Sequence, residues 1–202
     1  MGVEKFWDER YSGEKFVYGV EPNSFLRDHA EILPSCGRVL CLSEGEGRNA
    51  VFLAGQGFDV HAVDFSTVAR DKAFSLAALR RVSISYDVAD LADYNLGEEQ
   101  WDAIVSIFAH THPDTRSLVW KRIVPSLKRG GVFLFESYHP QQIDGGYQTG
   151  GPKDASWMVR QQMLRRAFPE LEILHEYSGE REVVEGNGHT GMAYVTQFIG
   201  RL

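Results

Sequence analysis

The sequence is poor in cysteine, in long apolar runs and in positive charge, and each shortage excludes a class of protein. Its 202 residues include two cysteines, Cys36 and Cys41, which lack the paired spacing of a zinc knuckle or a disulfide framework. No apolar run approaches the roughly 18 residues that a membrane-spanning helix needs, and the polar start of the chain does not resemble a cleavable leader. We therefore expect a cytoplasmic protein with reduced thiols and no membrane partner.

Positive charge is scarce as well. The 21 Lys and Arg residues are outnumbered by 28 Asp and Glu, which gives a formal net charge of -7. Nucleic acids are bound by clustered Lys and Arg that displace counterions from phosphates, so we expect no nucleic-acid partner. The length of the chain and its 43% hydrophobic content favour a single domain over residues 1–202, as a monomer or a homodimer.

Short apolar or β-branched runs alternate along the chain with longer segments of helical period. This is the pattern of the α/β class, in which strands are joined through helices into a parallel sheet. The predicted strands are 38–43, 59–65, 83–89, 101–108, 131–137, 171–182 and 192–201, and the predicted helices are 23–32, 47–56, 66–80, 113–128 and 156–167. The connection 185–191 is too short for a helical crossover, so the last two strands are predicted to be antiparallel.

The most informative motif is a glycine bend between the first strand and the next helix, at Gly45 and Gly47. In an open α/β sheet, nucleotides bind beyond the carboxyl end of the first strand, where glycines let the backbone approach the ligand. Asp64 ends the second strand and is followed by Phe65 and Ser66. Its carboxylate can accept hydrogen bonds from both hydroxyls of an adenosine ribose. The alternative is that Asp64 supports the next helix, although Ser66 can cap that helix itself.

Two further features bear on the identity of the nucleotide. Asp90 ends the third strand, where a carboxylate can accept a hydrogen bond from an adenine amine while Leu91 lines the ring. NAD would place its pyrophosphate over the glycine bend, where Glu44 and Glu46 would repel it. S-adenosylmethionine (SAM) carries a sulfonium, an ammonium group and only one carboxylate. The acidic bend therefore favours SAM and leaves an NAD-dependent reductase as the weaker alternative.

These residues resemble class I SAM-dependent methyltransferases, most closely a small bacterial and archaeal group related to tellurite-resistance and thiopurine methyltransferases. The resemblance covers nearly the whole chain and rests on segments 6–11, 18–23, 45–49, 63–66, 106–110, 136–140 and 185–191. It implies a Rossmann-like doubly wound sheet of seven strands in the order 3-2-1-4-5-7-6, with strand 7 antiparallel. It also implies that segment 1–34 covers the cofactor on a core formed by residues 35–202.

The resemblance implies a cofactor site made of residues from several segments. The predicted cofactor-binding residues are Trp7, Tyr11, Tyr18, Gly19, Glu44, Gly45, Gly47, Arg48, Asn49, Asp64, Phe65, Ser66, Asp90, Leu91 and Phe108. The chain departs from the family at Cys41, where an acid is usual, and at Ser43, where a glycine or another small residue is usual. Weaker binding of the methionine moiety is therefore expected, and Glu44 is a candidate for the missing carboxylate. A SAM-binding regulatory module without catalysis is the corresponding alternative.

Methyl transfer from a sulfonium is a direct displacement, so the protein contributes mainly alignment and exclusion of water. The fourth and fifth strands end near His110, His112, Tyr138 and His139, and an imidazole there can take a proton from an acceptor near neutral pH. We predict that the methyl acceptor is a small molecule. His110 is the first candidate for the base that takes its proton, and His139 and Tyr138 are the other catalytic candidates. The alternative is that these side chains cap the backbone or face solvent. No metal is expected, and His189 is interpreted as either an acceptor-side or a solvated hairpin residue.

Overall fold

Within residues 3–186 and 189–202, which the structure, a computed structural model, describes, seven strands form one mixed sheet. The strands are β1 (Arg38–Leu42), β2 (Asp59–Asp64), β3 (Ser85–Val88), β4 (Trp101–Ile107), β5 (Leu127–Tyr138), β6 (Glu172–Glu185) and β7 (His189–Arg201). The helices are α1 (Val3–Tyr11), α2 (Ser24–His29), η1 (Ala30–Ile32), α3 (Arg48–Gly55), α4 (Thr67–Arg80), α5 (Pro113–Ser126), α6 (Gln141–Asp144), η2 (Ala155–Trp157) and α7 (Gln161–Ala167). None of these described helices is long and apolar enough to cross a membrane.

The strand order is β3-β2-β1-β4-β5-β7-β6, as the resemblance implied. Strands β1 to β5 pair in parallel, whereas β7 is antiparallel to both β5 and β6. The predicted sheet and the predicted antiparallel hairpin are therefore confirmed. The Rossmann sheet that binds dinucleotides has the order 3-2-1-4-5-6, without an inserted antiparallel strand. The topology of the sheet thus speaks against the NAD-dependent reductase.

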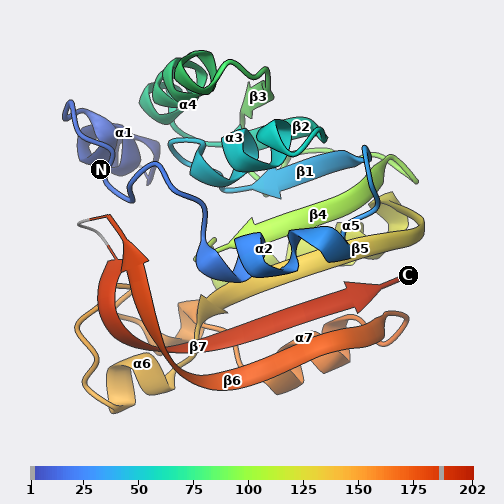
Figure 1. Ribbon diagram of the computed structural model, residues 1–202. Helices are drawn as coiled ribbons and strands as arrows, with labels where there is room; N and C mark the ends of the chain where they lie inside the picture. Colours follow the sequence, from blue (N-terminus) through green and yellow to red (C-terminus); the bar gives the residue numbers. More distant parts are fainter. Residues whose placement is uncertain (1–2, 187–188) are drawn as a thin grey trace.

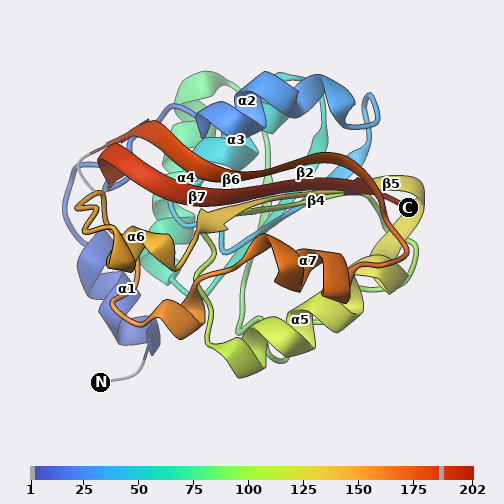
Figure 2. The ribbon, with the colours of Figure 1, turned by 90° about the horizontal axis from the view of Figure 1, so that it is seen from below.

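Helices cover both faces of the sheet, and the alternation of side chains along β1 shows how the core is divided. Val39 and Cys41 pack against α2, α3 and α4, and Leu40 and Leu42 pack against α5 and the α7 region. Figure 2 shows these two helix layers on opposite sides of the sheet. Cys41 is fully buried, and burial raises the pKa of its thiol. At the position where an acid is usual, this chain therefore has a neutral thiol that packs in the core with residues of α3.

The region between α5 and β5 differs from the prediction of a helix to 128 and a strand from 131. The helix ends at Ser126, and the strand begins at Leu127. Pro125 lies inside the last turn of the helix, and a proline contributes no N–H to a helix. Leu127 is buried and pairs with Trp101 of β4. Burial and strand pairing thus end the helix earlier than its periodicity predicts.

The predicted helix 156–167 is interrupted at residues 158–160, where the chain is extended between η2 and α7. The Val159 N–H donates to the Tyr138 carbonyl at 3.1 Å, and the Thr196 hydroxyl donates to the Val159 carbonyl at 2.7 Å. These bonds hold Val159 extended, so only η2 and α7 are helical. Helices α1 and α6 were not predicted at all.

The β6–β7 hairpin is longer than predicted. Its strands remain paired as far as Glu185 and His189, beyond the expected ends at 182 and 192. The predicted connection 185–191 includes Asn187 and Gly188, which lie outside the described residues. Figure 1 shows α1 and this end of the hairpin at the same edge of the sheet, where β1 and β4 end. The fold therefore gathers distant segments at the carboxyl edge of the parallel strands.

Candidate functional site

The bend after β1 has left-handed backbone at three positions. The φ angles are 51° at Ser43, 61° at Gly45 and 89° at Gly47. A Cβ added at Gly47 would lie 2.6 Å from the Cβ of Ala73, which α4 places against the start of α3. Glycine is therefore required at Gly47 for both its backbone angle and its close approach to α4.

The left-handed backbone at Ser43 explains why a small residue is expected there. That conformation costs an L-residue about 1–2 kcal/mol, which a glycine avoids. We predict that Ser43→Gly raises the free energy of unfolding by about 0.5–1 kcal/mol, after the larger entropy of glycine in the unfolded chain is subtracted. Urea denaturation measures this change. Ser75→Gly in α4 is the matched control and should lower stability by about 0.5 kcal/mol; a loss at Ser43 would contradict the argument.

Asp64, at the end of β2, holds the bend in place. Its Oδ2 accepts the Gly45 N–H at 3.0 Å, and its Oδ1 accepts the Ser66 N–H at 3.2 Å. Burial raises the pKa of this carboxyl group, and the N–H groups of Ser66, Gly45 and Phe65 oppose the shift. Ser66 itself caps α4, because its hydroxyl accepts the Ala69 N–H at 3.1 Å. Asp64 is therefore free of the capping role and keeps acceptor capacity for a ligand.

The two acids of the bend are both engaged by other groups of the protein. Glu44 Oε1 accepts the Asn49 N–H at 2.9 Å and the Ala50 N–H at 2.7 Å, so it caps α3. Burial raises the pKa of Glu44 to about 7, against the opposing effect of those N–H groups and of the Arg48 charge. Glu46 lies 2.6 Å from the ammonium group of Lys72. The bend is therefore less negative than its sequence suggests, and Glu44 is engaged by its own helix before any ligand binds.

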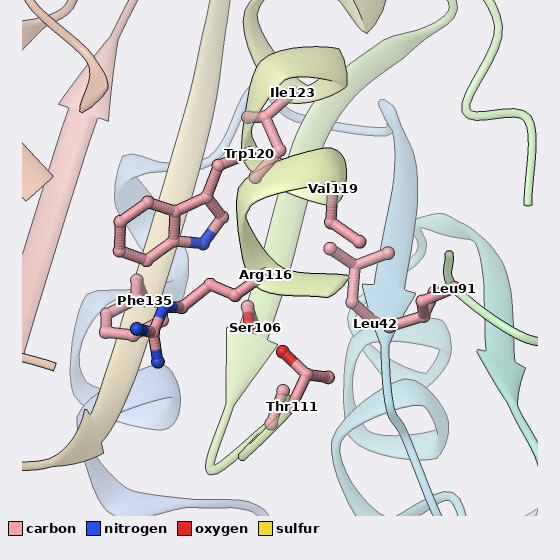
Figure 3. A pocket seen from close by; sticks show the side chains of 10 residues that line it. Leu42, Leu91, Ser106, Thr111, Arg116, Val119, Trp120, Ile123 and Phe135 are labelled. Atoms are coloured by element: carbon pink, nitrogen blue, oxygen red, sulfur yellow. The ribbon is translucent and has the colours of Figure 1, made fainter. Parts of the chain in front are cut away.

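The third predicted part of the site lies after β3. Asp90 is exposed and accepts the Ala92 N–H at 2.7 Å, whereas Leu91 is buried. Leu91 lines a cavity between β1, β4 and α5, and Figure 3 shows the Ser106 and Thr111 hydroxyls beside it. The cavity is lined by Leu42, Leu91, Ser106, Ala109, Thr111, Arg116, Val119, Trp120, Ile123 and Phe135. It is mainly apolar, as a site for a planar heterocycle would be.

The N-terminal segment covers the bend from outside. Tyr11 is buried, and a Cβ added at Gly45 would lie 2.9 Å from its hydroxyl oxygen. Trp7 stacks on Tyr11 with ring centroids 5.4 Å apart. The Lys72 ammonium group donates to the Tyr11 carbonyl at 3.1 Å and so ties this segment to α4. Trp7, Tyr11 and Gly45, which were all predicted to bind the cofactor, therefore lie together in the structure.

Gly19 and Gly186 mark a crossing of two backbones. A Cβ at Gly186 would lie 2.4 Å from the Gly19 nitrogen, and both residues have positive φ angles. The backbone of the β6–β7 hairpin is therefore in direct contact with the backbone of the N-terminal segment. Nearby, Asn49 Oδ1 accepts the Asn23 N–H at 2.9 Å and links that segment to α3. Gly19, which was predicted at the methionine end, packs against the hairpin.

The three predicted catalytic side chains all make structural hydrogen bonds. His110 Nε2 accepts the Tyr138 N–H at 3.3 Å, and burial, with the charges of His189 and Arg116, lowers its pKa to about 3. His139 Nδ1 accepts the Gln141 N–H at 3.0 Å. The Tyr138 hydroxyl donates to a main-chain carbonyl, and burial raises its pKa. These bonds do not support the choice of His110 as the first candidate base.

His189 lies in an aromatic cluster that the sequence did not reveal. Its ring centroid is 4.5 Å from that of Tyr18, 4.8 Å from Phe108 and 5.4 Å from Tyr138. The residue is only 7% exposed, so the interpretation as a solvated hairpin residue is wrong. Within the described part of the chain, no three His, Cys, Asp or Glu side chains are grouped as a metal ion would require.

Sequence reasoning also missed a buried ionic network beneath this cluster. Glu136 is fully buried and accepts hydrogen bonds from Arg181 at 2.7 Å and from Asn23 at 2.6 Å. Glu185 pairs with Arg48 at 2.5 Å and with Arg181 at 3.3 Å. Arg181 and Glu185 are four residues apart on one strand and therefore share a face. That spacing of opposite charges on a strand was the available sequence signal.

Comparisons with known proteins agree with the fold. Residues 39–131 match the family model of the methyltransferase domain. A structure solved for the conversion of a disulfide bond into a thioacetal group during echinomycin biosynthesis is 20% identical, with a TM-score of 0.74, over 98% of this chain and 92% of that chain. TehB from Haemophilus influenzae is 21% identical, with a TM-score of 0.73, over 98% of this chain and 66% of its own.

Two further matches are more distant or partial. The 1,6-didemethyltoxoflavin-N1-methyltransferase of Burkholderia thailandensis, solved with S-adenosylhomocysteine, is 18% identical, with a TM-score of 0.59, over 88% of this chain and 75% of its own. Hemagglutinin 1 of Eikenella corrodens is 29% identical over 114 residues, which are 48% of this chain and 38% of that protein. This chain thus matches under half of that curated relative. Residues 39–131 thus match a methyltransferase domain, and the sheet has the strand order of the class I SAM-dependent methyltransferase fold.

Proposed function

We propose that this chain, which has the class I methyltransferase fold and a methyltransferase domain over residues 39–131, transfers the methyl group of SAM to a small-molecule acceptor. The observation that carries the proposal is Asp64. This carboxylate is 8% exposed, spans the glycine bend and the start of α4, and keeps lone pairs for a vicinal diol. The ribose binds there, and the adenine lies toward Asp90 and Leu91.

The cofactor is SAM, and the methionine end fits the residues beyond the bend. The Arg48 side chain is buried, and its Nη1 has no hydrogen-bond partner among the described residues, while its Nη2 is held by Glu185. A buried guanidinium with an unused donor is costly unless a ligand completes it, and a carboxylate does so well. Arg48 therefore binds the methionine carboxylate, with Tyr11 and Tyr18 enclosing this end of the cofactor. When bound, SAM supplies the electrophilic methyl group.

A small acceptor is supported by the enclosure of the site. Segment 1–34 and the β6–β7 hairpin meet at Gly19 and Gly186, over the edge where β1 and β4 end. The aromatic side chains around His189 pack against one another next to that crossing. A macromolecular acceptor would have to displace this covering, whereas a small molecule would need only a local opening. We infer that residues 1–202 act as one domain in this reaction.

Calorimetry followed by a methyl-transfer assay tests the proposal. We expect SAM and S-adenosylhomocysteine (SAH) to bind and NAD not to bind. Incubation with SAM and a panel of thiols, phenols, amines and heterocycles should then release SAH with at least one of them. Binding without release across a broad panel would favour the non-catalytic regulatory module. Preferential binding of NAD would overturn the proposal and restore the reductase.

A further inference from the structure

The imidazoles at the carboxyl edge of the sheet differ in how their ring nitrogens are used. Three of the four rings accept a main-chain N–H, so one lone pair of each is already taken. The bonds run from Tyr138 to His110 Nε2 at 3.3 Å, from Asp114 to His112 Nδ1 at 3.3 Å and from Gln141 to His139 Nδ1 at 3.0 Å. The His189 ring accepts no main-chain N–H among the described residues, and its buried Nδ1 has no hydrogen-bond partner there. It is therefore the one ring of the four with an uncommitted lone pair.

Glu185 stands on one side of the His189 ring. Its Oε2 lies 3.9 Å from His189 Nδ1, just beyond hydrogen-bond distance. The carboxylate is fixed from other directions by Arg48 at 2.5 Å, Asn23 at 2.7 Å and Arg181 at 3.3 Å. The two nitrogens of an imidazole point to different sides of the ring. With Nδ1 facing Glu185, Nε2 points away from this carboxylate.

We propose that His189 is the proton acceptor of the methyl-transfer reaction and that Glu185 is its positioning residue, an inference that rests on the proposed function. The Nδ1–H faces Glu185, which fixes the tautomer and leaves the Nε2 lone pair for the acceptor. A carboxylate that orients an imidazole in this way is a recurrent arrangement for a general base. The acceptor is accordingly a compound that gives up a proton from N, O or S as it is methylated.

The step balances in atoms, electrons and charge. A lone pair of the acceptor heteroatom forms the new bond to the methyl carbon, and the electron pair of the breaking carbon–sulfur bond goes to sulfur, giving SAH. The acceptor proton moves to His189 Nε2 and later leaves to solvent. One positive charge thus passes from the sulfonium to the imidazolium. Glu185, only 3.9 Å from the ring, is the anion that stabilises it there.

The charges around His189 come from several elements. Glu185 faces it from β6, Arg48 from α3 and Arg10 from α1, and the Tyr18 and Tyr138 rings lie against it. His110 also couples electrostatically to it. Burial lowers the pKa of His189, and Glu185 opposes that shift. The ring is therefore neutral at neutral pH and ready to accept a proton.

Nitrogen NMR of histidine-labelled enzyme in complex with SAH tests the assignment without an acceptor. At pH 7.5 we expect His189 to be neutral, with its proton on Nδ1 and a bare Nε2. Glu185→Gln should lower the pKa of His189 by about one unit and mix the two tautomers. A proton on Nε2 with a bare Nδ1, or a ring that stays charged from pH 6 to pH 9, would overturn the proposal.

Kinetics with known nucleophiles provide the second test. For 2-mercaptoethanol, phenol or catechol, which are protonated at neutral pH, His189→Gln should lower kcat at least about 100-fold for whichever the wild type methylates, while the Kd for SAH changes less than about threefold. Iodide carries no proton, so its methylation should fall less than about threefold. His61→Gln is the matched control, because His61 pairs with Asp87 at 2.8 Å on the β2–β3 side. It should leave both rates unchanged.

The outcomes separate this proposal from the one on which it rests. If wild-type enzyme binds neither SAM nor SAH, the proposed function fails first. If it binds both and His189→Gln methylates a proton-bearing acceptor at the wild-type rate, only the role of His189 is refuted. If none of the three nucleophiles is methylated, the NMR experiment alone tests the role of His189: a proton on Nδ1 supports the role, and a proton on Nε2 refutes it. Circular dichroism of the variant guards against a loss of folding.

Discussion

Asp64→Asn weakens SAM and SAH binding at least about 100-fold, because the amide cannot accept both ribose hydroxyls as the carboxylate does. Hydrogen bonds to charged groups contribute about 1.5–3 kcal/mol each, and every 1.4 kcal/mol is a factor of ten in Kd. The substitution keeps the volume of the side chain, but an NH2 group replaces one acceptor oxygen, so one of the two main-chain hydrogen bonds that Asp64 accepts is lost as well. Isothermal titration calorimetry with both ligands measures the effect.

Asp87→Asn is the control for this measurement. Asp87 lies on the neighbouring strand β3, where its carboxylate binds His61 and Tyr94 instead of the bend. We expect its Kd values to stay within about twofold of the wild type. Thermal unfolding provides a second readout, since a ligand raises stability only in proportion to its occupancy. SAH should raise the melting temperature of the wild type and of Asp87→Asn but not that of Asp64→Asn; an unchanged Kd for Asp64→Asn would refute the ribose assignment.

The sheet was predictable because its signals are local and repeated. Along β1, successive residues such as Leu40 and Cys41 belong to opposite faces, and both faces are apolar because helices cover each one. The short connection between β6 and β7 required an antiparallel pair, as observed. The order of the strands, by contrast, came from the resemblance to known methyltransferases, since periodicity does not specify which strands are neighbours.

The short helices were not predictable for a physical reason. Helices of this length are marginal by themselves, and contacts with distant residues decide whether they form. In α1 the Asp8 carboxylate accepts a hydrogen bond from the Ser66 hydroxyl at 2.5 Å, across 58 positions of sequence. Conversely, Val159 lies in a stretch of helical period that the sheet holds extended through Tyr138 and Thr196.

The chemistry of the site depended even more on distant partners. In the sequence, the bend carries two negative charges. In the structure, Lys72 forms an ion pair with Glu46, and N–H groups at the start of α3 donate hydrogen bonds to Glu44. Likewise, the sequence placed several imidazoles on one edge without showing which lone pairs the backbone uses. His110 and His189 are therefore distinguished only by their hydrogen bonds in the folded chain.

Arg181→Met lowers the free energy of unfolding by about 3–5 kcal/mol, because it removes the cation that neutralises a fully buried carboxylate. The guanidinium binds both oxygens of Glu136 at 2.7 Å and also contacts Glu185. Methionine replaces the apolar stem but not the charge. At about 2–4 °C per kcal/mol for a chain of this size, the melting temperature should fall by about 10 °C. Urea denaturation and calorimetry measure both quantities.

Arg165→Met is the matched control, since Arg165 pairs with Glu176 but its side chain is 59% exposed. Such a pair contributes up to about 1 kcal/mol, so this variant should stay close to the wild type. If the cost of Arg181→Met comes from the stranded charge, then Glu136→Gln in the same chain should recover at least about half of it, because an amide needs no cation. No recovery would mean that lost packing is the cause. Since Asn23 also bridges Glu136 and Glu185, recovery would further show that charge neutralisation at this point holds the N-terminal segment and the hairpin together over the site.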